Sequence, residues 1–343
     1  MKKFKNLKSF TMAEILISMT IIGIVALMTL PSLLSKINAR ALNTQKRALF
    51  AKLSQGIAMM SGLNGYGDYT AEVTEDDNIV TAGVDTAAES FITDGLSKVL
   101  KIHSVCAASY SDNDEKVRKA LKNCGLSETY KDALGNVKDF PTSYNVLNLS
   151  GMDASVVKAK THAAAFRTVN GESVAVLYNP NAADDFYIGN YNNQFTLRKD
   201  TLSAVFIFDL NGLKGPNRFG QDIGIITAIF STHPKLSYIE PDTNNIVAVN
   251  NSLSLFKKQC EKVNKSYKLP DLYELYSMLA VRPLIAVPSN IGSSLRRNIA
   301  TSTIFYDDNN RVWAWLPLNS LFSTTPLGND VSFLWCNNDI FKK

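Results

Sequence analysis

The sequence is short of cysteine, of net charge and of long apolar runs, and each shortage excludes a class of protein. Four cysteines in 343 residues, with no C-x-x-C pair, cannot build a disulfide-dense scaffold. Beyond the N-terminus no apolar run is long enough for a second membrane span, which excludes a multi-pass membrane protein. Four of the 36 basic residues lie in residues 1–9, and the remaining 32 face 31 acidic residues, so the charge gives no sign of nucleic-acid binding. A hydrophobic fraction of 45% is typical of a folded chain, and the length suffices for two domains.

The N-terminus combines a short basic start with one apolar run. Residues 1–9 carry four lysines and no acid, and the twenty residues from Ile15 to Leu34 carry no charge. At about 1.5 Å per residue, a helix over this run spans the roughly 30 Å hydrocarbon core of a membrane, and the lysines place its start on the cytoplasmic side. A cleaved signal peptide has a shorter apolar region, and a plain signal anchor has no use for the acid at Glu14. An unpaired carboxylate inside a membrane costs about 3 kcal/mol, so Glu14 needs a partner or a role.

The residues around Glu14 point to such a role. The segment from Ser9 to Ile15 reads SFTMAEI and resembles the prepilin cleavage site of type IV pilins and type II secretion pseudopilins. The resemblance implies that a prepilin peptidase cuts between Ser9 and Phe10 and methylates the new amine, leaving residues 10–34 as a transmembrane and assembly helix. It also implies that Glu14 pairs with the N-terminal amine of a neighbouring subunit. The family prefers glycine before the cut, whereas this chain has Ser9.

The apolar pattern predicts that the helix continues beyond the membrane segment. Apolar residues recur at spacings of three, four and seven, so residues 35–62 are predicted as an amphipathic continuation that ends near Gly62. Pro31 has no amide hydrogen and predicts a kink or loosening over residues 27–31. The continuation carries five basic residues and no acid, which suits a lipid-facing or partner-facing surface or an ordinary solvated face: Lys36, Arg40, Lys46, Arg47 and Lys52.

Residues 63–250 are predicted to form a pilin-like globular head, in which the long helix packs on an antiparallel sheet. β-branched and aromatic residues predict strands at 173–178, 204–210 and 223–230, and helical spacing predicts helices at 88–102 and 113–122. Cys106 and Cys124 flank the second of these helices. Outside the cytoplasm they either form a bridge that contributes about 3 kcal/mol of stability or remain two unpaired thiols.

The segment between the last two predicted strands is rich in asparagine, glycine and proline. It runs from Asp209 to Asp222 as DLNGLKGPNRFGQD and resembles strings found in bacterial pilin-like proteins. Asp209, Asn211 and Asp222, together with loop carbonyls, are candidate oxygen ligands for Ca²⁺. The spacing is not that of an EF-hand, because Leu213 and Gly220 stand where oxygen ligands are needed. The same residue types also form tight turns without a metal.

The pattern changes near residue 251, and residues 251–343 are predicted as a separate small α+β module. Asp271 and Glu274 have the spacing of a capping box before an apolar helix, and strands are predicted at 301–307, 311–318 and 331–336. A helix bearing Cys260, an LPxxxEL helix start, Trp-rich strands and the late Cys336 resemble C-type-lectin-like modules, and this resemblance implies a Cys260–Cys336 bridge. The fold alone does not establish sugar binding. The tryptophans suit either core packing or stacking on a ligand: Trp313, Trp315 and Trp335.

The two resemblances imply an α+β structural protein: a subunit, in a minor position, of a type IV pilus or a type II secretion pseudopilus-like filament. The implied partners are other pilin or pseudopilin subunits, prepilin peptidase and the cytoplasmic membrane before assembly, with an extracellular carbohydrate or protein as a candidate ligand. The bulk of the chain would lie outside the cytoplasm, first anchored in the cytoplasmic membrane and then in a cell-surface or envelope filament. The alternative is a single-pass membrane-anchored binding protein with a lectin-like domain. No cofactor besides calcium is predicted, and no enzyme, because the three histidines are isolated and no HExxH, P-loop or nucleophile elbow occurs.

Overall fold

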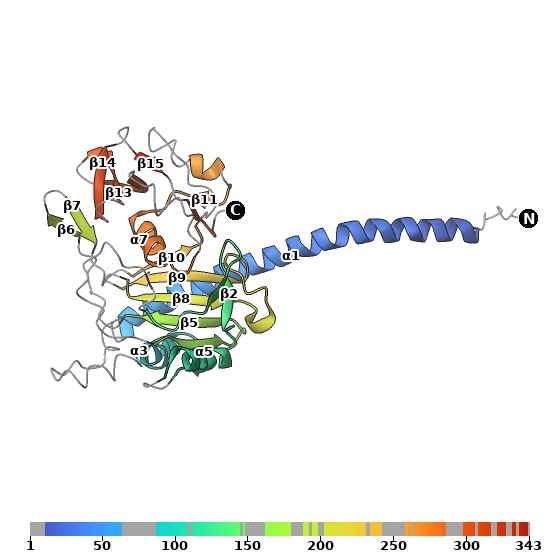
Figure 1. Cartoon of the computed structure of the whole chain (residues 1–343), viewed down its shortest axis with the longest axis horizontal. Helices are drawn as coiled ribbons and strands as arrows, with labels where there is room; N and C mark the ends of the chain where they lie inside the picture. Colours follow the sequence, from blue (N-terminus) through green and yellow to red (C-terminus); the bar gives the residue numbers. More distant parts are fainter. Residues whose placement is uncertain are drawn as a thin grey trace, which may run out of the picture. The chain divides into compact units, whose positions relative to one another are not determined.

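The computed structural model describes residues 11–63, 87–108, 112–144, 147, 162–179, 188–191, 194–197, 202–230, 234–241, 258–262, 264–285, 298–305, 308–316, 321–326, 331–333 and 336–341. Within these ranges the chain is an α+β protein with a long N-terminal helix and a six-stranded antiparallel sheet, as the sequence predicts (Figure 1). The chain divides into two compact units, residues 1–45 and residues 46–343.

The N-terminal helix α1 runs from Met12 to Leu63, a length of 52 residues that confirms the predicted continuation to about residue 62. Pro31 lies inside it, and the backbone stays helical on both sides of the proline. Pro31 removes only one backbone hydrogen-bond donor from α1. The helix can continue past it because leucine and methionine, which favour helices, surround the proline. The apolar side chains between residues 12 and 37 are exposed. The predicted kink at Pro31 stays a prediction.

The unit of residues 46–343 contains a six-stranded sheet in which all neighbours are antiparallel. The strands, in spatial order, are β1 (Ile102–Cys106), β4 (Ala164–Thr168), β5 (Ser173–Tyr178), β8 (Ala204–Asp209), β9 (Ile223–Ile229) and β10 (Lys235–Ile239). The three strands predicted from sequence are β5, β8 and β9, each within one residue of its predicted bounds. Every residue of these three strands is buried, which requires a cover on both faces of the sheet.

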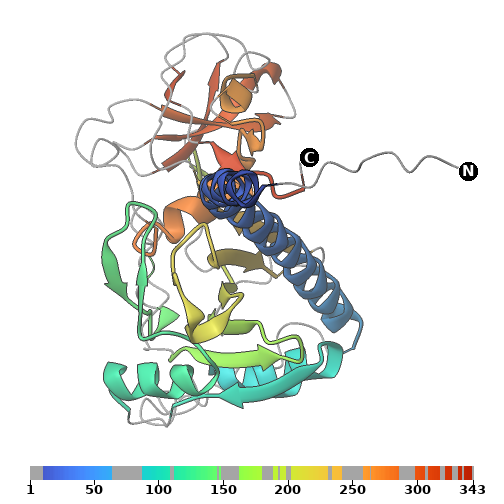
Figure 2. The ribbon, with the colours of Figure 1, turned by 90° about the vertical axis from the view of Figure 1, so that its right-hand side faces the viewer.

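One face of the sheet is covered by the last third of α1 and by a second helical segment (Figure 2). The α1 side chains that supply this cover are Leu49, Leu53, Ile57 and Met60, each at most 1% exposed. The second segment, predicted at 88–102, consists of three consecutive pieces: α3 (Ala87–Ser90), η1 (Phe91–Leu96) and α4 (Ser97–Val99). Phe91 stacks on Tyr178 of β5 with ring centroids 4.5 Å apart, so this segment packs directly on the aromatic face of the sheet.

The opposite face carries an extended hydrophobic cluster. Side chains of β5 and β8 such as Ala175 and Ile207 join Val117 and Leu121 of α5 (Asp114–Asn123). Helix α7 (Leu272–Ala280) belongs to the same cluster through Leu275 and its neighbours. A two-stranded hairpin, β2 (Thr129–Lys131) and β3 (Val137–Asp139), completes this side, because its Tyr130 is also part of the cluster. The sheet is therefore the middle of three layers, and residues beyond 251 contribute to its core.

The C-terminal strands form a second six-stranded sheet. In spatial order they are β15 (Val331–Phe333), β12 (Asn298–Phe305), β13 (Asp308–Leu316), β14 (Leu321–Pro326), β7 (Gln194–Leu197) and β6 (Ile188–Tyr191), with only β12 and β15 parallel among the described pairs. The strands predicted at 301–307, 311–318 and 331–336 correspond to β12, β13 and β15. Two strands of this sheet, β6 and β7, come from before residue 250. The domain boundary at 250/251 stays a prediction, and the shared sheet and the shared core of α7 both cross it.

Local signals in the C-terminal region place its helix as predicted. Asp271 accepts a hydrogen bond from the Glu274 amide at 2.8 Å, and Glu274 Oε2 accepts one from the Asp271 amide at 3.1 Å, which is the reciprocal pattern of a capping box. A short pair, β11 (Tyr267–Lys268) with β16 (Asn337–Asn338), ties the segment before α7 to the end of the chain. Residues 258–262 around Cys260 are helical, and residues 251–257 lie outside the described part of the chain.

Both candidate disulfides are present. Cys106, at the end of β1, is joined to Cys124, at the end of α5, and Cys260 is joined to Cys336 next to β16. No free cysteine is left. The first bridge closes a loop with a sequence separation of 18, and it fixes an edge strand to the helix that covers the core.

Replacing Cys106 and Cys124 together by alanine is expected to lower the free energy of unfolding by about 3 kcal/mol, because the unfolded chain regains the entropy of that loop. Urea unfolding of the full-length chain in detergent measures this loss. An unchanged free energy of unfolding would contradict a stabilising role for the bridge.

Candidate functional site

The predicted processing site is described only in part. Ser9 and Phe10 lie outside the described residues, whereas Glu14 lies in the first turn of α1. Its Oε2 accepts hydrogen bonds from the backbone amide of Thr11 at 2.9 Å and from Thr11 Oγ1 at 3.0 Å, and Thr11 Oγ1 accepts one from the Glu14 amide at 3.3 Å. These contacts form a capping box, which the T-x-x-E spacing already carries in the sequence. Glu14 therefore has a local role at the helix start beside the assembly role that the resemblance implies.

Helix α1 is long and apolar enough to cross a membrane, over the stretch Met12–Met60, by length and composition. Among the described residues no other helix meets that condition. This is compatible with single-pass anchoring through the N-terminus.

The turn between β8 and β9 carries all three predicted calcium ligands, Asp209, Asn211 and Asp222. Asp209 Oδ1 accepts hydrogen bonds from the amides of Asn211 and Gly212, at 3.1 and 2.8 Å. Asp222 accepts two others, from the amides of Asn217 and Arg218, at 2.9 and 2.8 Å. The two carboxylates thus organise the two ends of the turn, which contains a short 3-10 helix, η4 (Gly212–Lys214).

Three buried side-chain oxygens in this turn accept no hydrogen bond from any residue that the structure describes. They are Asp209 Oδ2, Asn211 Oδ1 and Asn217 Oδ1. Asp209 is only 1% exposed, and burial raises the pKa of its carboxyl to about 7, with the negative charge of Asp222 adding to the rise. Asn217 was not among the ligands predicted from sequence. In the sequence, Asn217 is marked only by being an asparagine next to a glycine and a proline. Such a residue is equally expected in a turn that binds no metal.

A buried lysine joins the same turn to helix α1. Lys46 is 2% exposed, and its Nζ donates to the carbonyl of Gly220 at 2.7 Å and to Glu240 Oε2 at 3.2 Å. Glu240 also contacts the hydroxyl of Tyr238, and burial together with the Glu240 charge raises the pKa of that phenol well above its usual range. The interpretation of the basic stretch as a solvated face is therefore wrong for Lys46, because a carboxylate distant in the sequence neutralises it.

The network extends to the end of the chain. Asn337 Oδ1 accepts a hydrogen bond from the Glu240 amide at 3.0 Å, and Asn337 Nδ2 donates to the Tyr238 carbonyl at 2.8 Å. Asn337 follows Cys336 directly, so the second disulfide lies close to Glu240, the residue after β10. Glu240 is thereby held through its side chain by Lys46 and through its backbone amide by Asn337, two residues that are distant from it in the sequence.

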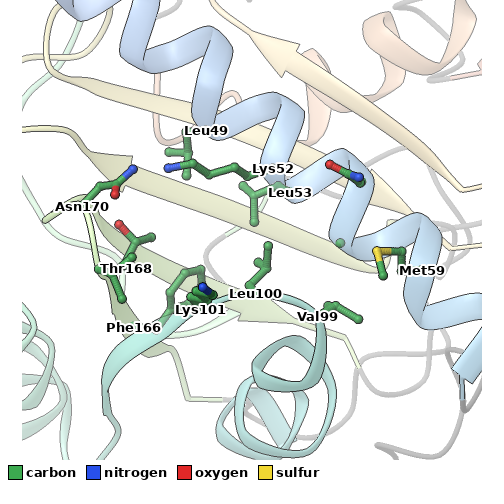
Figure 3. Close-up of a pocket in the computed structure, with 13 residues that line it drawn as sticks. Leu49, Lys52, Leu53, Met59, Val99, Leu100, Lys101, Phe166, Thr168 and Asn170 are labelled. Carbon is green, nitrogen blue, oxygen red and sulfur yellow. The ribbon is translucent and has the colours of Figure 1, made fainter.

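An open pocket of about 340 Å³ lies between α1 and the edge of the sheet (Figure 3). Its lining is mostly aliphatic and aromatic, with Leu53 of α1 above Leu100 and Met59 of α1 near Val99. Two lysines border it: Lys52, which pairs with Glu172 at 3.2 Å, and Lys101. No Asp, Glu, His or Cys lines this pocket, so its described lining lacks a general base or a nucleophile other than hydroxyl and amine groups.

The three tryptophans that the sequence offered as ligand-stacking residues cannot be placed in a site. Trp313 and Trp315 belong to β13, and their side chains, like Trp335, lie outside the described part of the chain. Within the described residues, no group of three or more His, Cys, Asp or Glu side chains is placed to hold a metal ion. That criterion does not cover the β8–β9 turn, because two of the three buried oxygens without a donor there belong to asparagine side chains.

Comparisons with protein-family models, with curated proteins and with solved structures found no match to this chain. The functional argument therefore depends on the residues and contacts described above.

Proposed function

We propose that the chain is a structural subunit, in a minor position, of a type IV pilus or type II secretion pseudopilus-like filament. One observation carries this proposal. A single helix, α1, exposes apolar side chains between residues 12 and 37 and buries Leu49, Leu53 and Ile57 completely. Such a helix suits two environments at once, a membrane or helix bundle at its start and the core of a folded domain at its end.

The proposed life of the subunit follows from the N-terminal segment. It is inserted in the cytoplasmic membrane with its bulk outside, a prepilin peptidase cuts between Ser9 and Phe10, and the trimmed helices pack together in a filament. Glu14 pairs there with the terminal ammonium of a neighbouring subunit, since opposite charges attract strongly in a medium of low dielectric. No catalytic reaction is part of this proposal.

The N-terminal mass of the native protein tests the proposal, measured in the membrane fraction and in filaments sheared from the cell surface. We expect a chain that begins at methylated Phe10, nine residues shorter than the full sequence, and that is present in the sheared fraction. A chain that begins at Met1 and occurs only in membranes would contradict processing and assembly. That result would favour the second candidate.

The second candidate is a single-pass membrane-anchored extracytoplasmic binding protein with a C-type-lectin-like domain. The Cys260–Cys336 bridge favours it, because the lectin-like resemblance implies that pairing. Its ligand would be an extracellular carbohydrate or protein. If the chain binds such a ligand and is never found in filaments, the second candidate is supported over the first.

The proposed subunit also carries a calcium ion in the turn between β8 and β9. The support is the buried carboxylate oxygen of Asp209, which accepts no hydrogen bond from the described residues. Calcium in a turn between two core strands would act as a structural ion of the head.

A further inference from the structure

The open pocket between α1 and the edge of the sheet has a polar end and an apolar end. Lys52 of α1 and Asn170 of the β4–β5 turn lie at the polar end, and the Lys52 ammonium is fixed there because it donates to Glu172 Oε1 of the same turn at 3.2 Å. Met59, two helical turns further along α1, lies near Val99 at the apolar end (Figure 3). The two ends are therefore about 10 Å apart along the helix.

The wall between the two ends is apolar and already formed. Leu53 and Phe166 are fully buried, and Leu100 lies below Leu53. Gly56 lets α1 approach this wall closely, because a β-carbon at Gly56 would lie only 3.0 Å from Leu100 Cδ2. Met59 is 51% exposed, so the apolar end is open to an entering molecule. Water in such a pocket faces mostly carbon, and an alkyl chain that replaces it gains hydrophobic free energy.

The polar end has positive charge and hydrogen-bond donors to offer. An ammonium group has three N–H donors, and one of those on Lys52 serves Glu172. The run from Val99 to Lys101 leads from the apolar end towards the β4–β5 turn, and Lys101 forms no ion pair with any residue that the structure describes. Glu172 balances one of the two ammonium charges and the lining contains no acid, so a net positive charge remains for an anionic group.

The separation of the two ends sets the length of a matching ligand. An extended carbon chain advances about 1.2 Å per bond, so about 10 Å corresponds to roughly eight carbon–carbon bonds. A volume of about 340 Å³ is near the lower limit of ligand pockets, which begin at roughly 300 Å³. This pocket therefore suits one alkyl chain with a small anionic head better than a phospholipid with two chains.

We propose that the pocket binds a medium-chain fatty acid of about eight to twelve carbons, with its carboxylate beside Lys52 and Lys101 and the end of its chain beside Met59 and Val99. Binding is non-covalent, and it adds a ligand site to the chain whether or not the chain enters filaments. Because each buried methylene strengthens binding about fourfold, decanoate should bind about tenfold more tightly than octanoate.

Photo-cross-linking of the full-length chain in phosphatidylcholine nanodiscs tests the proposal. The probe is decanoic acid with a diazirine near the end of its chain, and peptide mass mapping locates the label. We expect saturable labelling of the segments that contain Met59 and Val99. An excess of unlabelled decanoate should remove it, and octanoate should require about ten times the concentration. Decanol and decyltrimethylammonium should compete poorly, because neither offers an anionic group to the lysines.

Two pairs of variants separate the pocket from the rest of the surface. Met59→Glu places a negative charge at the apolar end, and Val137→Glu is its matched control, because Val137 is 67% exposed on β3 and outside the pocket. Lys101→Met removes a cation of the pocket, and Lys214→Met removes an exposed cation in η4. We expect labelling about tenfold or more weaker in Met59→Glu, about fivefold weaker binding in Lys101→Met, and native behaviour in both controls.

The positions changed are exposed, so all four variants should keep the thermal midpoint of the native chain, which verifies that they are folded. A folded native chain without saturable labelling at these segments would overturn the proposal. Equal competition by decanol and decanoate would overturn the carboxylate as the recognised group, and full labelling of Met59→Glu would overturn this pocket as the site. None of these results bears on the assembly role of Glu14, because the chain is measured outside filaments.

Discussion

Replacing Glu14 by alanine is expected to abolish incorporation of the subunit into filaments while leaving its membrane insertion intact. The carboxylate is then missing from the helix bundle, and the ammonium of the neighbouring subunit stays unpaired in a medium of low dielectric, at a cost of about 3 kcal/mol or more. Immunodetection of the subunit in sheared filaments and in membranes measures both effects. Normal amounts in the sheared fraction would contradict the assembly role of Glu14.

The capping box at Thr11 makes two control variants informative. Glu14→Gln preserves the capping box, because glutamine serves at this position as glutamate does, but it removes the charge. Thr11→Ala preserves the charge and removes the cap. We expect Glu14→Gln to fail in assembly and Thr11→Ala to assemble; the reverse result would mean that the residue serves only the helix start.

Replacing Lys46 by methionine is expected to lower the free energy of unfolding by about 3–5 kcal/mol. The change leaves Glu240, 17% exposed, without its cation and the Gly220 carbonyl without its donor. At about 2 °C per kcal/mol for a domain of this size, the thermal midpoint should fall by about 6 °C or more. Thermal unfolding of the full-length chain in detergent measures this shift.

The chain offers a matched control on the same helix. Lys52 pairs with Glu172 at the same distance, 3.2 Å, but the lysine side chain is 38% exposed rather than 2%. Lys52→Met leaves Glu172, which is 6% exposed, without its cation, but Glu172 keeps the hydroxyl of Thr168 as a donor and water can replace much of the exposed ammonium. We therefore expect a smaller loss, of about 1 kcal/mol. Combining Lys46→Met with Glu240→Gln should recover about 1 kcal/mol or more relative to the sum of the single changes, and simple additivity would refute the direct pairing.

The sequence predicts the parts of the fold that are uniform along the chain. Strands β5, β8 and β9 are found to within a residue, because both faces of each are covered and their sequences are continuously apolar. The outer strands β1 and β10 and the inner strand β4 are missed, because their five-residue sequences IHSVC, KLSYI and AAFRT mix polar and apolar residues and give a weak strand signal. The pairing of β6 and β7 with the C-terminal strands joins segments more than a hundred residues apart, which no local pattern encodes.

The sites divide in the same way. Asp209 and Asn211 are visible from composition and spacing, and so is the capping box of Asp271 and Glu274. Lys46 is not, because its burial depends on Glu240, 194 positions away. Asn217 is not either, since its oxygen becomes significant only when the folded turn leaves it without a donor.

The burial of Leu49, Leu53, Ile57 and Met60 also determines where the chain can be shortened. A soluble version for crystallisation must keep α1 from about Lys46 onward, because a cut at the end of the helix would strip one face of the sheet and expose its aromatic side chains to water. The large exposed apolar side chains of the N-terminal half, between Met12 and Ile37, precede Lys46 and would be removed. The exposed apolar stretch and the folded domain are thus separable only within the helix itself, near residue 45, and not at the glycines that follow it.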